Sequence, residues 1–168
     1  MQEVKTGLVI IGAGPGGLSA ALYARRAGLD FEIVEKKMAG GQIINTDFIE
    51  NYPGLKENIA GFELAQNFVE HCRRFDIKVE DYFAVNSIEV ASRGEKGKSY
   101  NFKCLGDEKL IWTNAIIMAT GASPDRLNVE GENEFIGRGI SFCGTCDGVL
   151  YKDKEVAVAG GGDTAIEE

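Results

Sequence analysis

The sequence predicts an α/β protein in which a parallel sheet is built from strand–turn–helix units. Two observations carry this prediction. A short apolar run, Leu8–Ile11, leads directly into the glycine-rich stretch Gly12–Gly17. A second apolar run, at residues 156–159, ends in glycines in the same way. Short runs of this kind are typical of strands that are buried on both faces of a parallel sheet.

The first 35 residues predict one β-α-β unit. Residues 8–11 form its first strand. A helix follows from Pro15 to Ala27, because proline suits a first helical turn and Gly28 suits a C-terminal cap. Phe31–Glu35 is the second strand. Such a unit is expected to be parallel and right-handed.

The region after this unit predicts a loop at 38–58 and a helix from about Phe62 to Phe75. Four residues at helical spacing are expected to face the core, namely Ala65, Phe68, Val69 and Cys72.

Further strands are predicted at 78–90 and at 99–112, with turns at 92–94 and at Gly106-Asp107. Ala115–Ala119 is expected to be another buried strand.

Composition excludes several classes of partner. The 168 residues carry a net charge of −8, which disfavours nucleic acid and anionic membrane surfaces. No apolar run approaches the ~20 residues that span a bilayer. The N-terminal residues lack the pattern of a signal peptide, so a cytoplasmic location is expected. In that compartment the four cysteines are expected to be reduced, catalytic or buried.

The stretch Gly12-x-Gly14-x-x-Gly17 matches a dinucleotide-binding turn. Its glycines allow a tight turn, a close approach of pyrophosphate to the backbone, and close packing of helix on strand. Glu35 ends the following strand, where a carboxylate can accept hydrogen bonds from ribose hydroxyls. The sequence therefore predicts a first nucleotide site at Gly12, Gly14, Pro15, Gly17 and Glu35.

A second turn of the same kind, Gly160-x-Gly162-x-x-Ala165, follows the apolar run at 156–159. Composition changes after Gly121, which predicts a domain boundary near 118–124, with one domain over 1–118 and the beginning of another over 119–168. The second nucleotide is expected to contact Gly160, Gly162, Asp163 and Thr164.

Between the two turns lies Cys143-x-x-Cys146-Asp147. A zinc site is disfavoured, because a structural site needs four ligands, Cys72 and Cys104 form no second pair, and there is one histidine. A redox-active pair is favoured, and C-x-x-C spacing lowers thiol pKa values. Asp147 is expected either to exchange protons with that pair or to serve only as a turn or helix N-terminal residue.

Together these residues resemble the low-molecular-weight, bacterial-type thioredoxin reductases. The matching stretches are Gly12–Gly17, Glu35, Gly40-Gly41-Gln42, Asn51–Gly54, Ala119–Ala122, Gly137–Gly139, Cys143–Gly148 and Gly160–Glu168. The resemblance implies a three-layer, Rossmann-like domain of the pyridine nucleotide-disulfide oxidoreductase type that binds FAD, followed by the start of a similar NADPH-binding domain. It also implies that the chain corresponds to an N-terminal portion of such an enzyme, in which the segment that closes the FAD domain is absent.

The resemblance assigns roles to individual residues. Glu35 matches a ligand of the adenosine ribose of FAD, while Gly41, Gln42, Asn51, Gly121 and Ala122 match further FAD contacts. NADPH reduces the flavin in this family, the flavin reduces the disulfide, and the dithiol reduces thioredoxin. Cys146 matches the cysteine nearest the flavin and Asp147 matches the acid/base carboxylate. Members are homodimers. A non-catalytic FAD-binding fragment, or a related flavin reductase with another thiol partner, is the alternative.

Overall fold

The computed structural model describes residues 1–168 except 47, 96–97, 124, 163–164 and 167–168, and the side chains of 92–98 and 145–146 also lie outside the description. The chain forms two compact units, Met1–Gly121 and Ala122–Glu168. The assignment of these units to FAD and NADPH stays a prediction.

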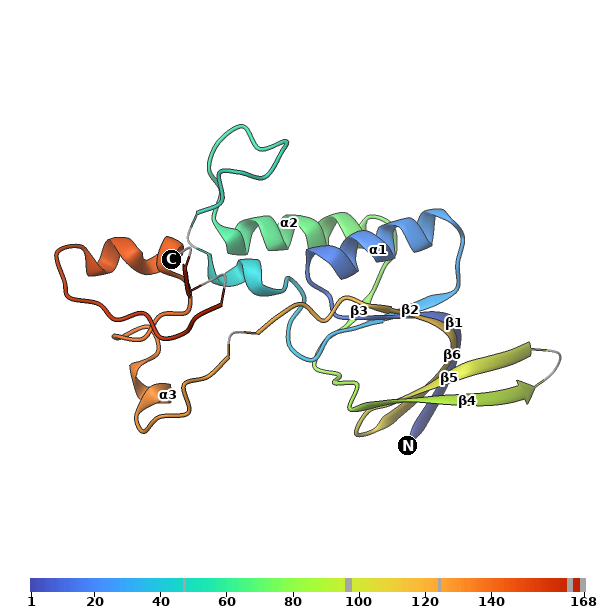
Figure 1. The fold of residues 1–168 in the computed structure, drawn as a ribbon. Coiled ribbons are helices and arrows are strands. Elements are labelled where there is room, and N and C mark those ends of the chain that lie inside the picture. Colours follow the sequence, from blue (N-terminus) through green and yellow to red (C-terminus); the bar gives the residue numbers. More distant parts are fainter. Residues whose placement is uncertain (47, 96–97, 124, 163–164, 167–168) are drawn as a thin grey trace. The chain divides into compact units, whose positions relative to one another are not determined.

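The first unit is built on one six-stranded sheet (Figure 1), with strand order β3-β2-β1-β6-β5-β4. The strands are β1 Gln2–Ile11, β2 Phe31–Val34, β3 Val79–Glu80, β4 Ser87–Glu95, β5 Lys98–Leu105 and β6 Lys109–Met118. Strand β1 pairs in parallel with both β2 and β6, and β3 pairs in parallel with β2. Strands β4, β5 and β6 pair antiparallel. Strand β6 therefore joins a parallel half of the sheet to an antiparallel half.

Two helices, α1 Pro15–Arg26 and α2 Gly61–Arg73, lie side by side over one face of the sheet (Figure 1). Their apolar faces join Leu8, Ile10 and Ile33 of the sheet in one buried cluster. Val9 and Ile11 point to the opposite face, where they form a second cluster with strand residues and with the segment that follows β3. The prediction that 8–11 is buried on both faces is therefore confirmed, and so is the α/β class.

The predicted helices are confirmed with small changes in their ends. Gly28 adopts φ +68° just after α1, as its expected role in the C-terminal cap requires. In α2, Ala65 and Cys72 are buried, and Phe68 and Val69 pack against the same cluster.

Two strand predictions and one turn prediction for the first unit are wrong at least in part. The single strand expected at 78–90 is two strands, because residues 81–86 leave the sheet and place Phe83 and Val85 against the second cluster. The turn expected at 92–94 lies inside β4. The strand expected at 115–119 is present as the second half of β6, which is continuous from the turn at Gly106-Asp107 onward, but it is not buried, since Ile117 and Met118 are 38% and 60% exposed.

The second unit consists of short helices joined by irregular segments. These are α3 Glu132–Phe135, α4 Gly144–Asp147 and the 3₁₀ helix η2 Gly148–Tyr151, while η1 Gln42–Asn45 belongs to the first unit. Among the described residues of 122–168 no strand forms, so the strand predicted at 156–159 is wrong. Val156 and Val158 are 66% and 60% exposed, because no neighbouring strand pairs with this segment. None of the described helices is long and apolar enough to cross a membrane.

Candidate functional site

At the glycine turn that follows β1, the neighbouring backbone leaves no room for a side chain at Gly12 or at Gly17. The Gly12 N–H donates to the Val34 carbonyl at 2.8 Å, and Gly12 adopts φ +104°. A Cβ on Gly12 would lie 2.2 Å from the carbonyl oxygen of Ala119. A Cβ on Gly17 would lie 1.8 Å from the Gly12 oxygen, so α1 can approach the turn this closely only with glycine there.

The N-terminus of α1 is open to an anion. Gly14 is the N-cap and Pro15 the first helical residue, and within the described chain no side chain caps this end. The first turn has no acidic residue, whereas Arg25 and Arg26 lie in the last turn. The backbone N–H groups of a first turn have no partner within the helix and lie at the positive end of its dipole. This end of α1 therefore fits a phosphate group.

Glu35 lies at the same turn. One of its carboxylate oxygens accepts a hydrogen bond from the Ala13 N–H at 2.8 Å, and the other accepts from the Lys37 N–H at 3.0 Å. These contacts hold the carboxylate beside the backbone on which a pyrophosphate would lie, at the end of β2. It is therefore placed to accept hydrogen bonds from a sugar.

The loop after β2 packs onto this turn. The Gly40 N–H donates to the Ala13 carbonyl at 2.8 Å, and a Cβ on Gly41 would lie 2.7 Å from the Gly14 Cα. Gln42 follows directly as the first residue of η1. The structure thus brings the two glycine-rich stretches together, although they are far apart in the sequence.

Sequence reasoning missed Asp81, a residue that supports this loop. Its carboxylate accepts a hydrogen bond from the Ala39 N–H at 2.8 Å, one residue before Gly40. An aspartate directly after a strand was the available signal, but nothing in the sequence paired it with Ala39.

The three other predicted FAD residues are exposed. Asn51 is exposed in the loop between η1 and α2. Gly121 is exposed with φ +67°, and it ends the first unit. Ala122 is exposed and begins the second unit. Their roles stay predictions.

The dithiol stretch forms the short helix α4. Cys143, just before it, is disulfide-bonded. The side chain of Cys146 lies outside the described residues, so the pairing of these two cysteines stays a prediction. Cys72 and Cys104 are free and buried, and burial raises the pKa of both thiols, which makes them poor nucleophiles.

Ser141 is a second residue that sequence reasoning missed. Its hydroxyl oxygen lies 2.6 Å from Asp147 Oδ2, and the Cys143 N–H donates to the same oxygen at 3.1 Å. The Asp147 N–H in turn donates to the Cys143 carbonyl at 3.0 Å. A serine side chain often bonds to the backbone N–H of the residue two positions later. The spacing of Ser141 and Cys143 was therefore the signal in the sequence that could have indicated this contact.

The second glycine turn is only partly described, since Asp163 and Thr164 lie outside the described residues. Gly160 adopts φ +137°, and a Cβ there would lie 3.1 Å from the Ala165 Cβ. The Ile166 N–H donates to the Gly162 carbonyl at 3.2 Å. The turn therefore has a glycine-dependent shape, but it lacks the preceding strand.

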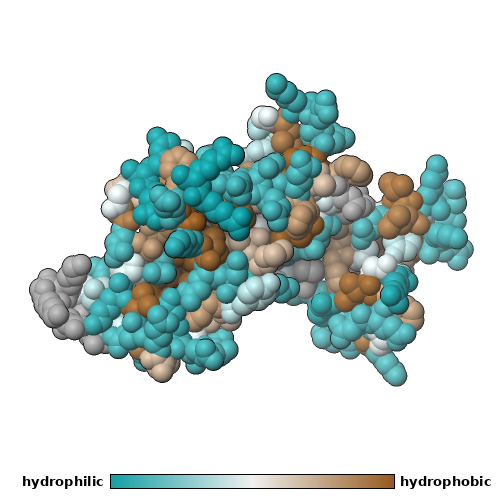
Figure 2. All heavy atoms as spheres, turned by 180° about the vertical axis from the view of Figure 1, so that it is seen from behind, coloured by the Kyte–Doolittle hydropathy of each residue, from teal (hydrophilic) through white to brown (hydrophobic). Residues whose placement is uncertain are grey.

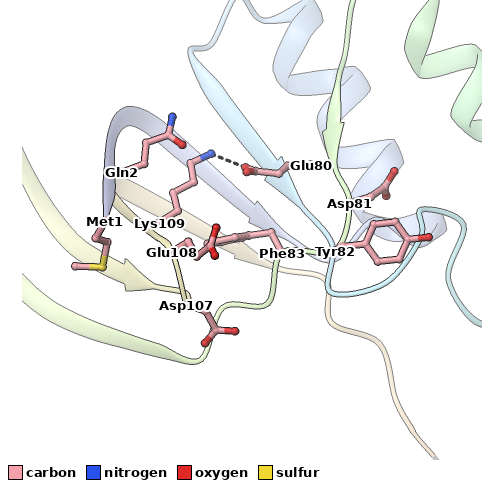
Figure 3. Close-up of a pocket in the computed structure, with 9 residues that line it drawn as sticks. All are labelled: Met1, Gln2, Glu80, Asp81, Tyr82, Phe83, Asp107, Glu108 and Lys109. Atoms are coloured by element: carbon pink, nitrogen blue, oxygen red, sulfur yellow. Dashed lines mark hydrogen bonds and ion pairs between the residues drawn. The ribbon is translucent and has the colours of Figure 1, made fainter.

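A cavity of about 620 Å³ beside the ends of the first unit's strands is a rival candidate site (Figure 3). Its lining residues are Met1, Gln2, Glu80, Asp81, Tyr82, Phe83, Asp107, Glu108 and Lys109. Four of them are acidic, and the one lysine makes an ion pair with Glu80. This excess of negative charge disfavours a phosphate ligand, so the glycine turn at Gly12–Gly17 is the better nucleotide site.

Comparisons with known proteins agree with this geometry. A thioredoxin reductase of Helicobacter pylori is 47% identical over 95% of this chain and 49% of its own length. A thioredoxin reductase of Vibrio cholerae is 41% identical over 100% of this chain and 51% of its own length. The crystal structure of a Streptococcus pyogenes thioredoxin reductase matches with a TM-score of 0.72 at 38% identity, over 98% of this chain and 51% of that one.

The predicted resemblance is thereby confirmed, and the chain spans about half the length of the curated relatives that it matches. The family model for pyridine nucleotide-disulphide oxidoreductases matches residues 6–168. With its glycine turn, α/β sheet and disulfide-bonded Cys143, the chain belongs to the pyridine nucleotide-disulphide oxidoreductase family.

Proposed function

We propose that this chain carries the FAD-binding turn and the redox-active disulfide of a flavoprotein disulfide reductase that transfers electrons from NADPH to thioredoxin. The observation that carries the proposal is the disulfide at Cys143, because it stands in a C-x-x-C-D stretch downstream of a nucleotide turn. Relatives named thioredoxin reductase share nearly the whole chain, which supports thioredoxin as the acceptor.

The first unit fits the adenosine and pyrophosphate part of FAD. The open N-terminus of α1 and the bare backbone at Gly12 and Gly14 would hold the pyrophosphate, and Glu35 would hold the ribose. Gly41 and Gln42, and then Asn51, Gly121 and Ala122, are proposed for the remainder of the cofactor. FAD, when bound, supplies the two electrons that open the disulfide.

Reduction of the Cys143–Cys146 disulfide takes up two electrons and two protons and gives two thiols. One thiolate then attacks the disulfide of thioredoxin and forms a mixed disulfide. The second thiolate breaks that bond, so that the chain regains its disulfide and thioredoxin leaves as a dithiol. Asp147 takes and returns the proton that these steps require.

The remaining assignments concern the whole protein. Gly160, Gly162, Asp163 and Thr164 are proposed to begin the NADPH site, and the enzyme is proposed to be a cytoplasmic homodimer. NADPH-driven turnover is not expected from the 168 residues alone, because the second glycine turn lacks its strand and FAD binding is expected to be weak.

The dithiol half of the reaction can be tested on the chain as it stands. The chain is reduced with dithiothreitol, desalted and mixed with oxidised thioredoxin in the absence of NADPH. We expect one thioredoxin dithiol to form per chain, and none from the Cys143→Ser variant. Efficient transfer to glutaredoxin or peroxiredoxin but not to thioredoxin would replace the proposed acceptor. Flavin absorbance without any disulfide transfer would favour the non-catalytic FAD-binding fragment.

A further inference from the structure

We propose that Ser141 is a positioning residue that holds the Asp147 carboxylate against the backbone of Cys143. The proposal rests on the proposed function, since Asp147 has a chemical role only if the dithiol reacts. Among the described residues, Ser141 bonds to the Asp147 carboxylate and to the backbone of Cys143, and it acts through Asp147.

The hydroxyl of Ser141 has one proton and two acceptors within reach. Its oxygen lies 2.6 Å from Asp147 Oδ2 and 3.1 Å from the Cys143 carbonyl. A hydroxyl donates more strongly and at shorter distance to a carboxylate than to a neutral carbonyl. The Ser141 hydroxyl therefore donates its hydrogen bond to Asp147. A lone pair of the same oxygen is left to accept from the Cys143 N–H, at 3.1 Å.

This arrangement closes a small ring across α4. The Asp147 N–H donates to the Cys143 carbonyl, which holds the aspartate main chain to the cysteine. The Ser141 hydroxyl adds a bond from the cysteine N–H to the aspartate carboxylate. Both ends of Asp147, its amide and its carboxylate, are therefore held relative to Cys143.

Loss of the hydroxyl leaves the carboxylate of Asp147 free to turn toward solvent, because this residue is only half-buried. A proton acceptor that is out of position slows the proton transfer, although the thiols and the disulfide that react stay the same. The expected effect is therefore on the rate of thiol exchange, and it requires the Asp147 carboxylate.

The experiment compares Ser141→Thr with Ser141→Val, which have the same shape and differ in the hydroxyl. Each variant is reduced, desalted and mixed with oxidised thioredoxin, and in parallel with oxidised glutathione, and the single-turnover rate is measured. Asp147→Asn and the double variant Ser141→Val/Asp147→Asn complete a double-mutant cycle for these two residues.

Ser123→Ala changes an exposed serine of the same unit and serves as the control. Far-ultraviolet circular dichroism checks that each variant folds.

We expect Asp147→Asn to slow exchange about a hundredfold and Ser141→Val about tenfold, while Ser141→Thr stays near the parent rate. The double variant should be no slower than Asp147→Asn alone, because Ser141 has nothing left to position. The variant at Ser123 should match the parent.

The outcomes separate this inference from the proposed function. A normal rate for Ser141→Val beside a slow Asp147→Asn would overturn the inference and leave the proposed function standing. Effects that multiply in the double variant would also overturn it, since Ser141 would then act independently. If the parent reduces glutathione but not thioredoxin, the proposed acceptor fails, and the same pattern of rates with glutathione still decides the role of Ser141.

Discussion

At the scale of one residue, Gly17 shows how closely α1 approaches the glycine turn that follows β1. Its missing Cβ would lie 1.8 Å from the Gly12 carbonyl oxygen, whereas a Cβ on Gly16 would meet nothing within 4 Å. A side chain is therefore excluded at Gly17 by a steric clash, whereas Gly16, its neighbour in the same helix, has space for one.

The change Gly17→Ala is expected to lower the free energy of unfolding by about 1–3 kcal/mol, because helix and turn must move apart. Gly16→Ala should raise it by up to about 1 kcal/mol, since alanine favours a helix more than glycine does. Urea unfolding followed by circular dichroism measures both. Equal effects of the two changes would contradict the close packing described at Gly17.

Glu35 gives a prediction for flavin binding. Glu35→Gln keeps the size of the side chain but weakens its bonds to the two N–H groups and to a ribose, so we expect FAD affinity to fall about tenfold. Glu32→Gln, on the same strand, should leave the affinity unchanged. Quenching of flavin fluorescence on titration with each protein measures the Kd, and an equal loss in both variants would argue against a specific contact.

Cys72 and Cys104 predict a pH dependence of stability. Burial raises the pKa of each folded-state thiol above the ordinary value of 9.0, so the unfolded chain loses these protons first as pH rises. The stabilisation is complete below pH 9 and is lost between pH 9 and the higher folded-state pKa. Urea midpoints measured from pH 8 to 10.5 should fall more steeply for the parent than for Cys72→Ala/Cys104→Ala. Parallel curves would contradict the prediction.

Residues whose role depends on the local sequence were predictable, and those whose partners are distant or unsignalled were not. The glycines of 12–17 and Glu35 follow a spacing that reflects one turn, and the structure brings them together as that turn. Asp81 bonds to Ala39, 42 residues away, and no local pattern pairs them. Ser141 was within two residues of Cys143, but its bond to Asp147 depends on α4, a helix that the glycine-rich sequence did not predict.

Among the elements, β6 shows why strand prediction was less accurate than helix prediction. Its first half pairs with both β1 and β5, and its second half pairs with β1 alone. The change of neighbours interrupts the apolar pattern at Trp112–Asn114, so one strand was interpreted as two. The helices kept a single buried face, and their period of 3.6 residues identified them.

The start of β6 supplies a prediction about an ion pair. Lys109 is 8% exposed, pairs with Glu80 at the end of β3, and lies over the Phe83 ring (Figure 3). Glu80→Gln leaves a buried ammonium without its partner and should lower the free energy of unfolding by about 1–3 kcal/mol. Glu89→Gln, which breaks the more exposed pair with Lys103, should cost less than about 1 kcal/mol.

Urea unfolding measures both variants. A double variant, Glu80→Gln/Lys109→Met, should recover much of the loss, because the buried charge is removed with its partner. If the double variant is less stable than Glu80→Gln alone, Lys109 stabilises the fold by another route.

At the scale of the whole molecule, the two units differ in how they bury apolar side chains. The two hydrophobic clusters formed by the described residues both lie within Met1–Gly121. In the second unit Val149, Leu150 and Val156 are exposed. Figure 2 shows hydrophobic side chains, in brown, at the surface of the molecule among hydrophilic ones. The apolar residues near 156–159 are exposed because no strand of the described part of the second unit pairs with this segment.

A chain that ends at Gly121 should therefore unfold in urea with a free energy within about 0.5 kcal/mol of the parent, because both clusters remain intact. Circular dichroism follows the transition, and a peptide of residues 122–168 should show no cooperative unfolding of its own. A large loss of stability in the shortened chain would mean that the second unit supports the first.

The pairing of β1 with β6 also determines how the first unit bears tension. The two strands run in parallel from Gln2–Lys109 to Ile11–Met118, and the Ala119 N–H extends the ladder by donating to the Ile11 carbonyl. The chain enters at the first residues of β1 and departs after the last residues of β6. A force that pulls these two points apart loads the whole ladder in shear, so its bonds must break together instead of one by one. The first unit should therefore resist a force applied in this direction, and the glycine turn lies at the end of the ladder where β1 and β6 both finish.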